Sequence, residues 1–151
     1  MSATEGQGPA ATTDLAGGAF LTALGLRFTE ISPTRVRGVI QLGPDHHTPW
    51  GVVHGGVYST AVETAASVGA SAAVFDRGQV AVGVANNTDF LRSVTSGAIQ
   101  VVAESIHQGR SHQLWQVTIT STETGKLVAR GQLRLANIPA SGVPNTVVPN
   151  S

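Results

Sequence analysis

The sequence of 151 residues contains no cysteine and few charged side chains. The absence of cysteine excludes disulfides, thiol nucleophiles and cysteine-ligated metals. Charged residues make up 12% of the chain, about half of the usual globular share, and nine basic residues balance nine acidic ones. Without a basic excess, we expect the chain to bind neither nucleic acid nor a membrane surface. So weakly charged a surface suggests that other copies of the chain cover part of it.

Long apolar runs are also missing. No stretch of about 18 apolar residues occurs, and the N-terminus has neither the basic nor the apolar part of a signal peptide. We therefore expect a soluble cytoplasmic protein. Residues 1–12 and the Pro-, Asn- and Ser-rich stretch from 138 onward are expected to be flexible tails around one domain, 13–137.

Hydrophobic periodicity predicts two strands and then a long helix followed by four strands. Because hairpin-linked strands form antiparallel sheets, this order indicates an α+β fold whose sheet packs on the helix. The expected elements are a short helix within 15–26 with Asp14 as N-cap, strands over 26–31 and 35–42, a helix from 55 to about 75, and strands over 79–90, 98–107, 112–121 and 126–135, with turns at Gly109 and Gly125. Alternation predicts three core-facing sets: Val36, Gly38, Ile40 and Leu42; Trp115, Val117 and Ile119; and Leu127, Ala129, Gly131, Leu133 and Leu135.

Glu63 is the only Asp, Glu, Lys or Arg in the stretch 46–75, in the middle of an alanine-rich helix. A buried unpaired carboxylate costs several kcal/mol, so we expect Glu63 to face a cavity that has a purpose. Helical spacing places Ser59, Ser67 and Ala70 on the same side. This stripe predicts a pocket floor, with Ser67 placed to bond the acid or a water. The alternative is a carboxylate that caps or pairs within an oligomer interface.

Gly55 and Gly56 begin this helix. Unpaired N–H groups and the positive dipole end favour an anion or a developing oxyanion there. The preceding His54 either bonds the turn or transfers protons. The histidines form no helical His-x-x-x-His pair, so no metal site is predicted. Motifs of serine hydrolases, P-loop NTPases and dinucleotide-binding enzymes are absent, which leaves acid–base or carboxylate chemistry on a carbonyl group.

Two stretches carry a resemblance to a known family. They are GVVHGGVYSTAVETAAS from Gly51 and AVGVANNTDFLRSVTSGAIQVVAESIHQGRS from Ala81. Together they resemble the hotdog-fold acyl-CoA thioesterases, particularly the branch of the phenylacetate-pathway thioesterase and the Arthrobacter-type 4-hydroxybenzoyl-CoA thioesterase. The resemblance covers roughly residues 20–136, and the acid nine positions after the histidine of His-Gly-Gly is its specific part. It implies a curved antiparallel sheet of five to six strands wrapped around a long central helix. It also implies dimers that commonly pair into tetramers, with the active site between subunits.

The resemblance further implies roles for individual residues. Glu63 would be the catalytic carboxylate, attacking the thioester or activating a water, and Gly55 would be the backbone donor to the thioester oxygen. The other catalytic-site positions are His54, Thr48 and Ser67, and the implied substrate or coenzyme A contacts are Gly56, Asn87, Arg92, Arg110 and Ser111. Arginine suits nucleotide phosphates, although ordinary exposed loop arginines are the alternative. No cofactor is implied beyond the coenzyme A of the substrate.

The chain departs from the family at Thr48, where members often carry Asn or Gln six residues before the histidine. His46 or His47 could take over that role. Members of the aromatic-CoA branch carry a threonine four residues after the acid, and here Ser67 supplies a similar hydroxyl. Two other functions stay open, a hotdog dehydratase or hydratase and a non-catalytic acyl-CoA sensor. The sequence lacks the His-Phe-Pro-Gly and Asp-x-x-x-x-His motifs of the first, and the stretch before the first strand is too short for the helix-turn-helix of the second. Trp50, Tyr58 and Phe90 either line an acyl pocket or belong to the core.

Overall fold

Six strands form one antiparallel sheet in the computed structural model, which describes residues 18–144. They are β1 (Arg27–Ile31), β2 (Arg35–Leu42), β3 (Gln79–Phe90), β4 (Gly97–Gln108), β5 (His112–Ser121) and β6 (Leu127–Pro139). The strand order β1-β2-β4-β5-β6-β3 leaves β1 and β3 at the two edges. All six predicted strands are therefore confirmed.

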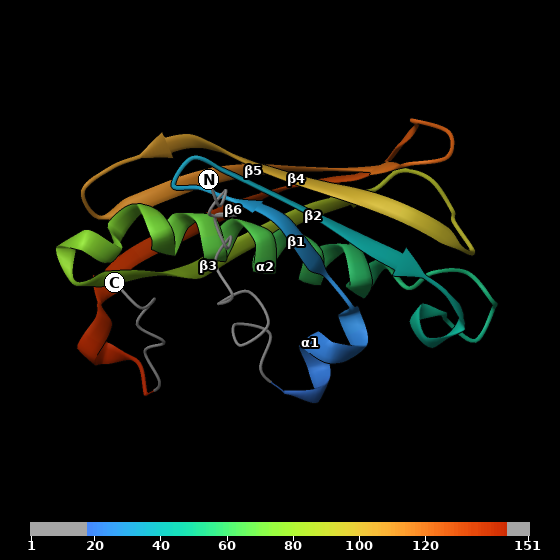
Figure 1. Cartoon of the computed structure of the whole chain (residues 1–151), viewed down its shortest axis with the longest axis horizontal. Coiled ribbons are helices and arrows are strands. Elements are labelled where there is room, and N and C mark those ends of the chain that lie inside the picture. The colour runs from blue at the N-terminus through green and yellow to red at the C-terminus, as the bar shows by residue number, and fades with distance from the viewer. Residues whose placement is uncertain (1–17, 145–151) are drawn as a thin grey trace, which may run out of the picture.

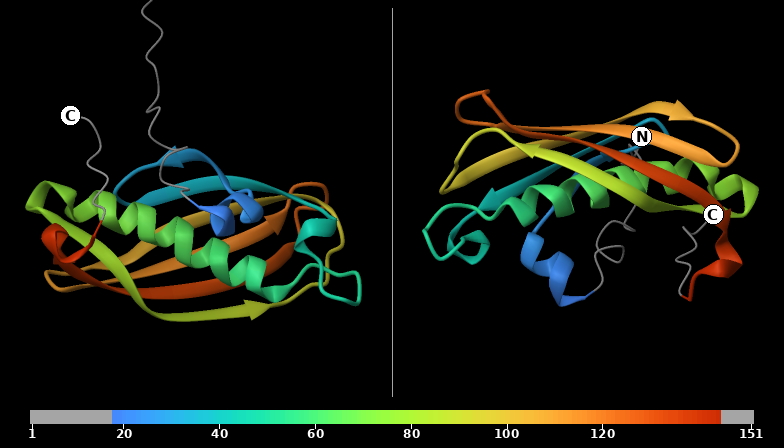
Figure 2. Two further views of the ribbon diagram at one scale, coloured as in Figure 1. Left: turned by 90° about the horizontal axis from the view of Figure 1, so that it is seen from below. Right: turned by 180° about the vertical axis from the view of Figure 1, so that it is seen from behind.

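The central helix α2 (Gly55–Val74) has 20 residues and lies across one face of the sheet, which curves over it (Figures 1 and 2). A shorter helix, α1 (Ala19–Leu24), lies near the N-terminal half of α2. Three short 3-10 helices follow β2, α2 and β6, namely η3 (Pro44–His46), η4 (Phe75–Arg77) and η5 (Ala140–Gly142). A curved antiparallel sheet around a long helix confirms the predicted hotdog architecture.

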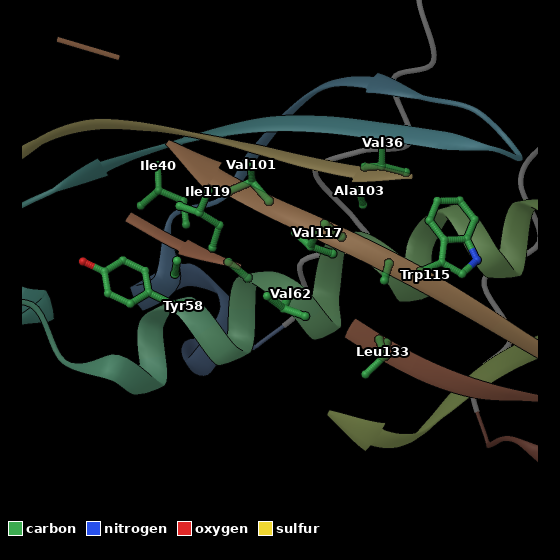
Figure 3. Close-up of a cluster of buried hydrophobic side chains, with 14 of the residues drawn as sticks. Val36, Ile40, Tyr58, Val62, Val101, Ala103, Trp115, Val117, Ile119 and Leu133 are labelled. Carbon is green, nitrogen blue, oxygen red and sulfur yellow. The ribbon is translucent and has the colours of Figure 1, made fainter. Parts of the chain in front are cut away.

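Side chains from the inner face of the sheet and from α2 form the core (Figure 3). The predicted inward sets of β2 and β5 are buried, and so is that of β6 from Ala129 onward. Leu127 is the exception and is 38% exposed, because the β5–β6 register shifts between Ile119 and Thr120. The burial of Gln113 was not predicted, because the residue is polar. It nevertheless lies on the core face of β5 with Trp115 and is only 1% exposed.

Gly69 allows α2 to approach the sheet closely. A Cβ at this position would lie 2.5 Å from the Trp115 ring and 2.8 Å from Val36. We expect Gly69→Ala to lower the free energy of unfolding by about 1–3 kcal/mol, because overpacking a closed core outweighs the helix propensity of alanine. Urea unfolding measures the effect, and the exposed Ala72 of the same helix provides the opposite control, since Ala72→Gly should cost about 1 kcal/mol through propensity alone. An increase in stability of Gly69→Ala would contradict this packing.

The ends of the domain differ from expectation in two places. The proposed N-cap Asp14 lies outside the described residues, and α1 begins after Gly18 without a side-chain cap. The suggested boundary between 137 and 138 falls inside β6, which continues to Pro139 and is followed by η5. No helix between residues 18 and 144 is long and apolar enough to cross a bilayer.

Candidate functional site

The first turn of α2 leaves a backbone donor unused. The His54 Nδ1 accepts a hydrogen bond of 2.7 Å from the Gly56 N–H, so His54 caps the helix. Of the two roles considered for His54, this is the hydrogen bond within the turn. The Gly55 N–H makes no hydrogen bond with any residue between 18 and 144. Gly55 is the first residue of a 20-residue helix, so its N–H also carries the positive end of the helix dipole. This geometry suits an oxygen with negative charge.

A cavity of about 280 Å³ lies beside Gly55. Its lining comprises Val53, Gly55, Tyr58, Phe90, Leu91, Arg92 and Ser93. The Phe90 ring packs against Gly55 so closely that a Cβ there would lie 2.4 Å from it, which explains the glycine. Gly55 and Arg92, two of the residues that the resemblance implies for the site, thus line the same cavity.

Tyr58 contributes both to this cavity and to the core. Its residue is 3% exposed, its ring centroid lies 6.0 Å from that of Phe90, and Figure 3 shows it at one end of the buried cluster. The hydroxyl has no hydrogen-bond partner within the described part of the chain. Burial raises the pKa of the Tyr58 hydroxyl, so the group stays protonated at neutral pH and can donate.

A second cavity, of about 370 Å³, lies between α1, the loop after β2 and the start of α2. His46 closes it by contacts to the backbone: its Nδ1 accepts from the Gly43 N–H, and its Nε2 lies 2.9 Å from the Ala23 carbonyl oxygen. The His47 Nε2 lies 2.6 Å from the Thr95 carbonyl oxygen. His46 and His47 were the candidates to replace the Asn or Gln that the family often carries at position 48. Both instead bond the backbone of loops, His46 through both ring nitrogens.

Thr48 shapes the tight turn that precedes His54. Its hydroxyl accepts a hydrogen bond of 3.2 Å from the Trp50 N–H, and its N–H donates to the Val52 carbonyl. Trp50 itself is 86% exposed and lines neither cavity. The expectation that Trp50 belongs to a pocket or to the core is therefore wrong for the single chain.

Glu63 is exposed and lines neither cavity of the single chain. Ser59 and Ser67 are half-buried, whereas Ala70 is fully buried. The carboxylate lies over Gly83, where a Cβ would be 3.4 Å from its Oε1, and it forms no ion pair or hydrogen bond with residues 18–144. Glu63 is exposed because β3 is an edge strand and no other part of residues 18–144 covers this side of α2.

The predicted contacts Asn87, Arg110 and Ser111 do not line the cavity beside Gly55. Asn87 is exposed on β3, and Arg110 and Ser111 lie exposed in the β4–β5 turn. This turn lies beside the C-terminal end of α2, opposite the end that carries Gly55 (Figure 1). Gln113, next to the turn, bonds the Ala70 carbonyl, and Ala70 lies 15 residues after Gly55, about 22 Å along the helix axis. One chain therefore does not bring Arg92 and Arg110 together. Within residues 18–144, no group of three His, Asp or Glu side chains is placed to hold a metal ion.

Comparisons with known proteins agree with this fold. The family described as the thioesterase superfamily matches residues 51–128. The Mycobacterium tuberculosis protein Rv1847/MT1895 is 47% identical over 123 residues, covering 80% of this chain and 87% of that protein. Its solved structure superposes with a TM-score of 0.76 and covers 80% of this chain and 96% of that one. The structure of S. sahachiroi AziG has 39% identity and a TM-score of 0.76, with 81% and 98% covered. The 1,4-dihydroxy-2-naphthoyl-CoA hydrolase of Listeria monocytogenes is 34% identical over 108 residues, which are 70% of this chain and 86% of that protein.

Proposed function

The chain belongs to the thioesterase superfamily, and from this premise we propose that it hydrolyses acyl-CoA thioesters to the free acid and coenzyme A. The observation that carries the proposal is the unused N–H of Gly55, a residue that lines a cavity together with Arg92. The Listeria relative is named for the hydrolysis of an aromatic acyl-CoA, which supports the same substrate class here. We extend the proposal to the branch of aromatic acyl-CoA thioesterases that the sequence resembles.

Gly55 supplies the electrostatic part of the reaction. The thioester carbonyl oxygen accepts a hydrogen bond from the Gly55 N–H. This hydrogen bond strengthens as the oxygen gains negative charge in the tetrahedral transition state. A preorganised donor of this kind contributes about 3–4 kcal/mol. The leaving group is a thiolate, which is stable enough to depart without a strong general acid.

Glu63 supplies the carboxylate, either by attacking the thioester carbon or by taking a proton from the attacking water. Ser67, half-buried one turn later on α2, would hold that water. His54 caps the helix by accepting the Gly56 N–H and so fixes the first turn, which carries the Gly55 N–H. Thr48 acts through the shape of its loop.

One copy of the chain cannot complete this site. Gly55 and Glu63 are eight residues apart, which is about 12 Å along the helix axis and too far for one thioester group. Residues 83–87 of β3 are exposed at the sheet edge, where backbone groups are free to pair with another strand. We therefore propose that two copies join by antiparallel pairing of their β3 strands.

The register of this pairing follows from the contacts of α2. Glu63 contacts Gly83, and Gly55 contacts Phe90. A pairing centred between Asn86 and Asn87 sets Gly83 of one copy opposite Phe90 of the other, so that Glu63 approaches the Gly55 of the second copy. The same two-fold axis brings the β4–β5 turn of one copy toward Arg92 of the other. Arg92, Asn87, Arg110 and Ser111 would then bind a single coenzyme A from two chains.

Release of free coenzyme A by the purified protein tests the proposed function. We expect hydrolysis of at least one ester in a series of phenylacetyl-, benzoyl- and straight-chain acyl-CoAs, with a dimer or tetramer in light scattering. Incubation with 3-hydroxyacyl and enoyl thioesters, followed by enoyl absorbance, examines the dehydratase alternative. Binding of the esters without any turnover would instead identify a sensor, and a monomer that hydrolyses them would refute the shared site.

A further inference from the structure

A buried amide cluster joins the β4–β5 turn to the rest of the fold. Its centre is Gln113, which the alternation of β5 places on the core face beside Trp115. Its Nε2 donates to the Ala70 carbonyl of α2 and to the Asn137 Oδ1, both at 2.9 Å. Its Oε1 accepts from the Trp115 Nε1 at 2.9 Å and from the Gln108 Nε2 at 3.2 Å. A glutamine amide can make four hydrogen bonds, and Gln113 makes all four.

The cluster ends on the backbone of the turn. The Asn137 Nδ2 donates to the carbonyl oxygens of Gly109 and Arg110, each at 3.2 Å. The Asn137 N–H donates to the Ser111 carbonyl at 2.9 Å. Three successive carbonyls of the turn are thus held by one residue of β6. The side chains of Arg110 and Ser111 remain exposed.

A purely structural explanation accounts poorly for this arrangement. An apolar side chain at 113 would fill the core at no cost in desolvation, whereas a buried amide is tolerated only when it is fully bonded. What hydrogen bonds add is direction, because they fix the orientation of the groups that they join. Arg110 forms no ion pair with residues 18–144, and His107 and His112 flank it. The turn thus presents basic side chains from a backbone that is held still.

We infer that Gln113 and Asn137 are positioning residues that hold the turn carrying Arg110 and Ser111 in place for the nucleotide phosphates of coenzyme A. This inference rests on the proposed function. Neither residue touches the substrate, and both act through the turn. Because a turn whose backbone is already held in place loses less conformational freedom on binding, the cluster lowers the KM for the complete coenzyme A ester and leaves the chemical step alone.

Asn137→Ala tests the inference, since Asn137 is half-buried and water can replace its bonds. The assay compares an acyl-CoA that the wild type cleaves with the same acyl group on pantetheine, which lacks the nucleotide. We expect KM for the acyl-CoA to rise about tenfold with little change in kcat, and kcat/KM for the pantetheine ester to stay constant. Arg110→Ala should give the same pattern, and the double variant should be no worse than Arg110→Ala alone. Thr122→Ala, which loses a hydroxyl bond to the Ala98 carbonyl near the β5–β6 turn, is the matched control and should leave both substrates unaffected.

Several results would overturn the inference. An equal loss with both substrates, no loss with either, or additive effects of Asn137→Ala and Arg110→Ala would mean that the cluster only stabilises the fold. If Asn137→Ala does not fold by circular dichroism, Gln108→Ala removes the rim of the same cluster at an exposed position and must show the same dependence on the nucleotide. A wild type that cleaves neither substrate would instead refute the proposed function, and with it the premise of the inference.

Discussion

Replacing Glu63 by glutamine is expected to reduce hydrolysis of acyl-CoA by about 10²–10⁴-fold, the usual contribution of a positioned acid or base. Glutamine has nearly the same shape but can neither accept the proton of water nor attack the thioester carbon. The fold should be unaffected, because the Glu63 carboxylate is exposed and has no hydrogen bond or ion pair with residues 18–144. Measurements of kcat and of the thermal midpoint on the same preparation separate the two effects.

Glu104 provides the matched control for this substitution. It is an exposed glutamate of β4 that follows the buried Ala103, so it lies on the face of the sheet opposite to α2, where its partners in the register are Arg35 and Gln116. Glu104→Gln should retain wild-type turnover. If Glu63→Gln also retained it, the carboxylate mechanism would be wrong, while a fall in the thermal midpoint of several degrees would point to a structural role for Glu63.

The surroundings of Glu63 mark the limit of what periodicity predicts. Local patterns correctly predicted α2 and the inward faces of β2 and β5, because helices and strands have fixed repeats. Whether one side of a helix is covered depends on the order of strands over it. Among the described residues β3, the strand after α2, pairs only with β6, the last strand in the sequence, and so becomes an edge. That order is set by contacts between distant segments, which no local repeat encodes.

Gln113 and the two arginines illustrate the same limit in different ways. The alternation through Trp115 placed Gln113 on the core face, but its polarity concealed the burial. A polar residue that interrupts a buried face was the available signal for the amide cluster. Arg92 and Arg110 were expected to share one ligand, and only the topology shows that they lie at opposite ends of α2. The proposed site therefore draws its two arginines from different copies of the chain.

Gly55→Pro is expected to lower kcat by about 10²–10³-fold, the cost of removing one oxyanion donor. Proline at the first helical position is compatible with α2, because the Gly55 N–H is unused and His54 has the extended conformation that precedes proline (φ −67°, ψ 134°). Any Cβ at 55 would collide with the Phe90 ring, so the comparison is made in a Phe90→Ala background. There, Gly55→Ala carries the same Cβ but keeps the N–H, and it should retain the activity that Gly55→Pro loses.

Mixing two inactive variants tests whether Gly55 and Glu63 of different copies form one site. The chain with Glu63→Gln keeps its Gly55 donor, and the chain with Gly55→Pro and Phe90→Ala keeps its carboxylate. In a mixed dimer with a shared site, one of the two sites receives both intact groups and the other receives neither. The restored site takes Gly55 and its neighbour Phe90 from the Glu63→Gln chain, so both are unaltered there. Since random exchange makes half of the dimers mixed, an equal mixture should recover about a quarter of the wild-type activity.

A site confined to one chain predicts a different outcome. Every site would then carry either Glu63→Gln or Gly55→Pro, and the mixture would stay as inactive as its components at any ratio. Exchange of subunits must be verified by labelling the two chains, because dimers that never exchange would also remain inactive. With exchange established, absence of recovery would refute the two-copy site, whereas recovery would require the carboxylate of one copy to lie beside the helix N-terminus of the other. The 12 Å rise of α2 between Gly55 and Glu63 makes recovery the expected result, since pairing of the exposed β3 edges is the arrangement that closes this distance.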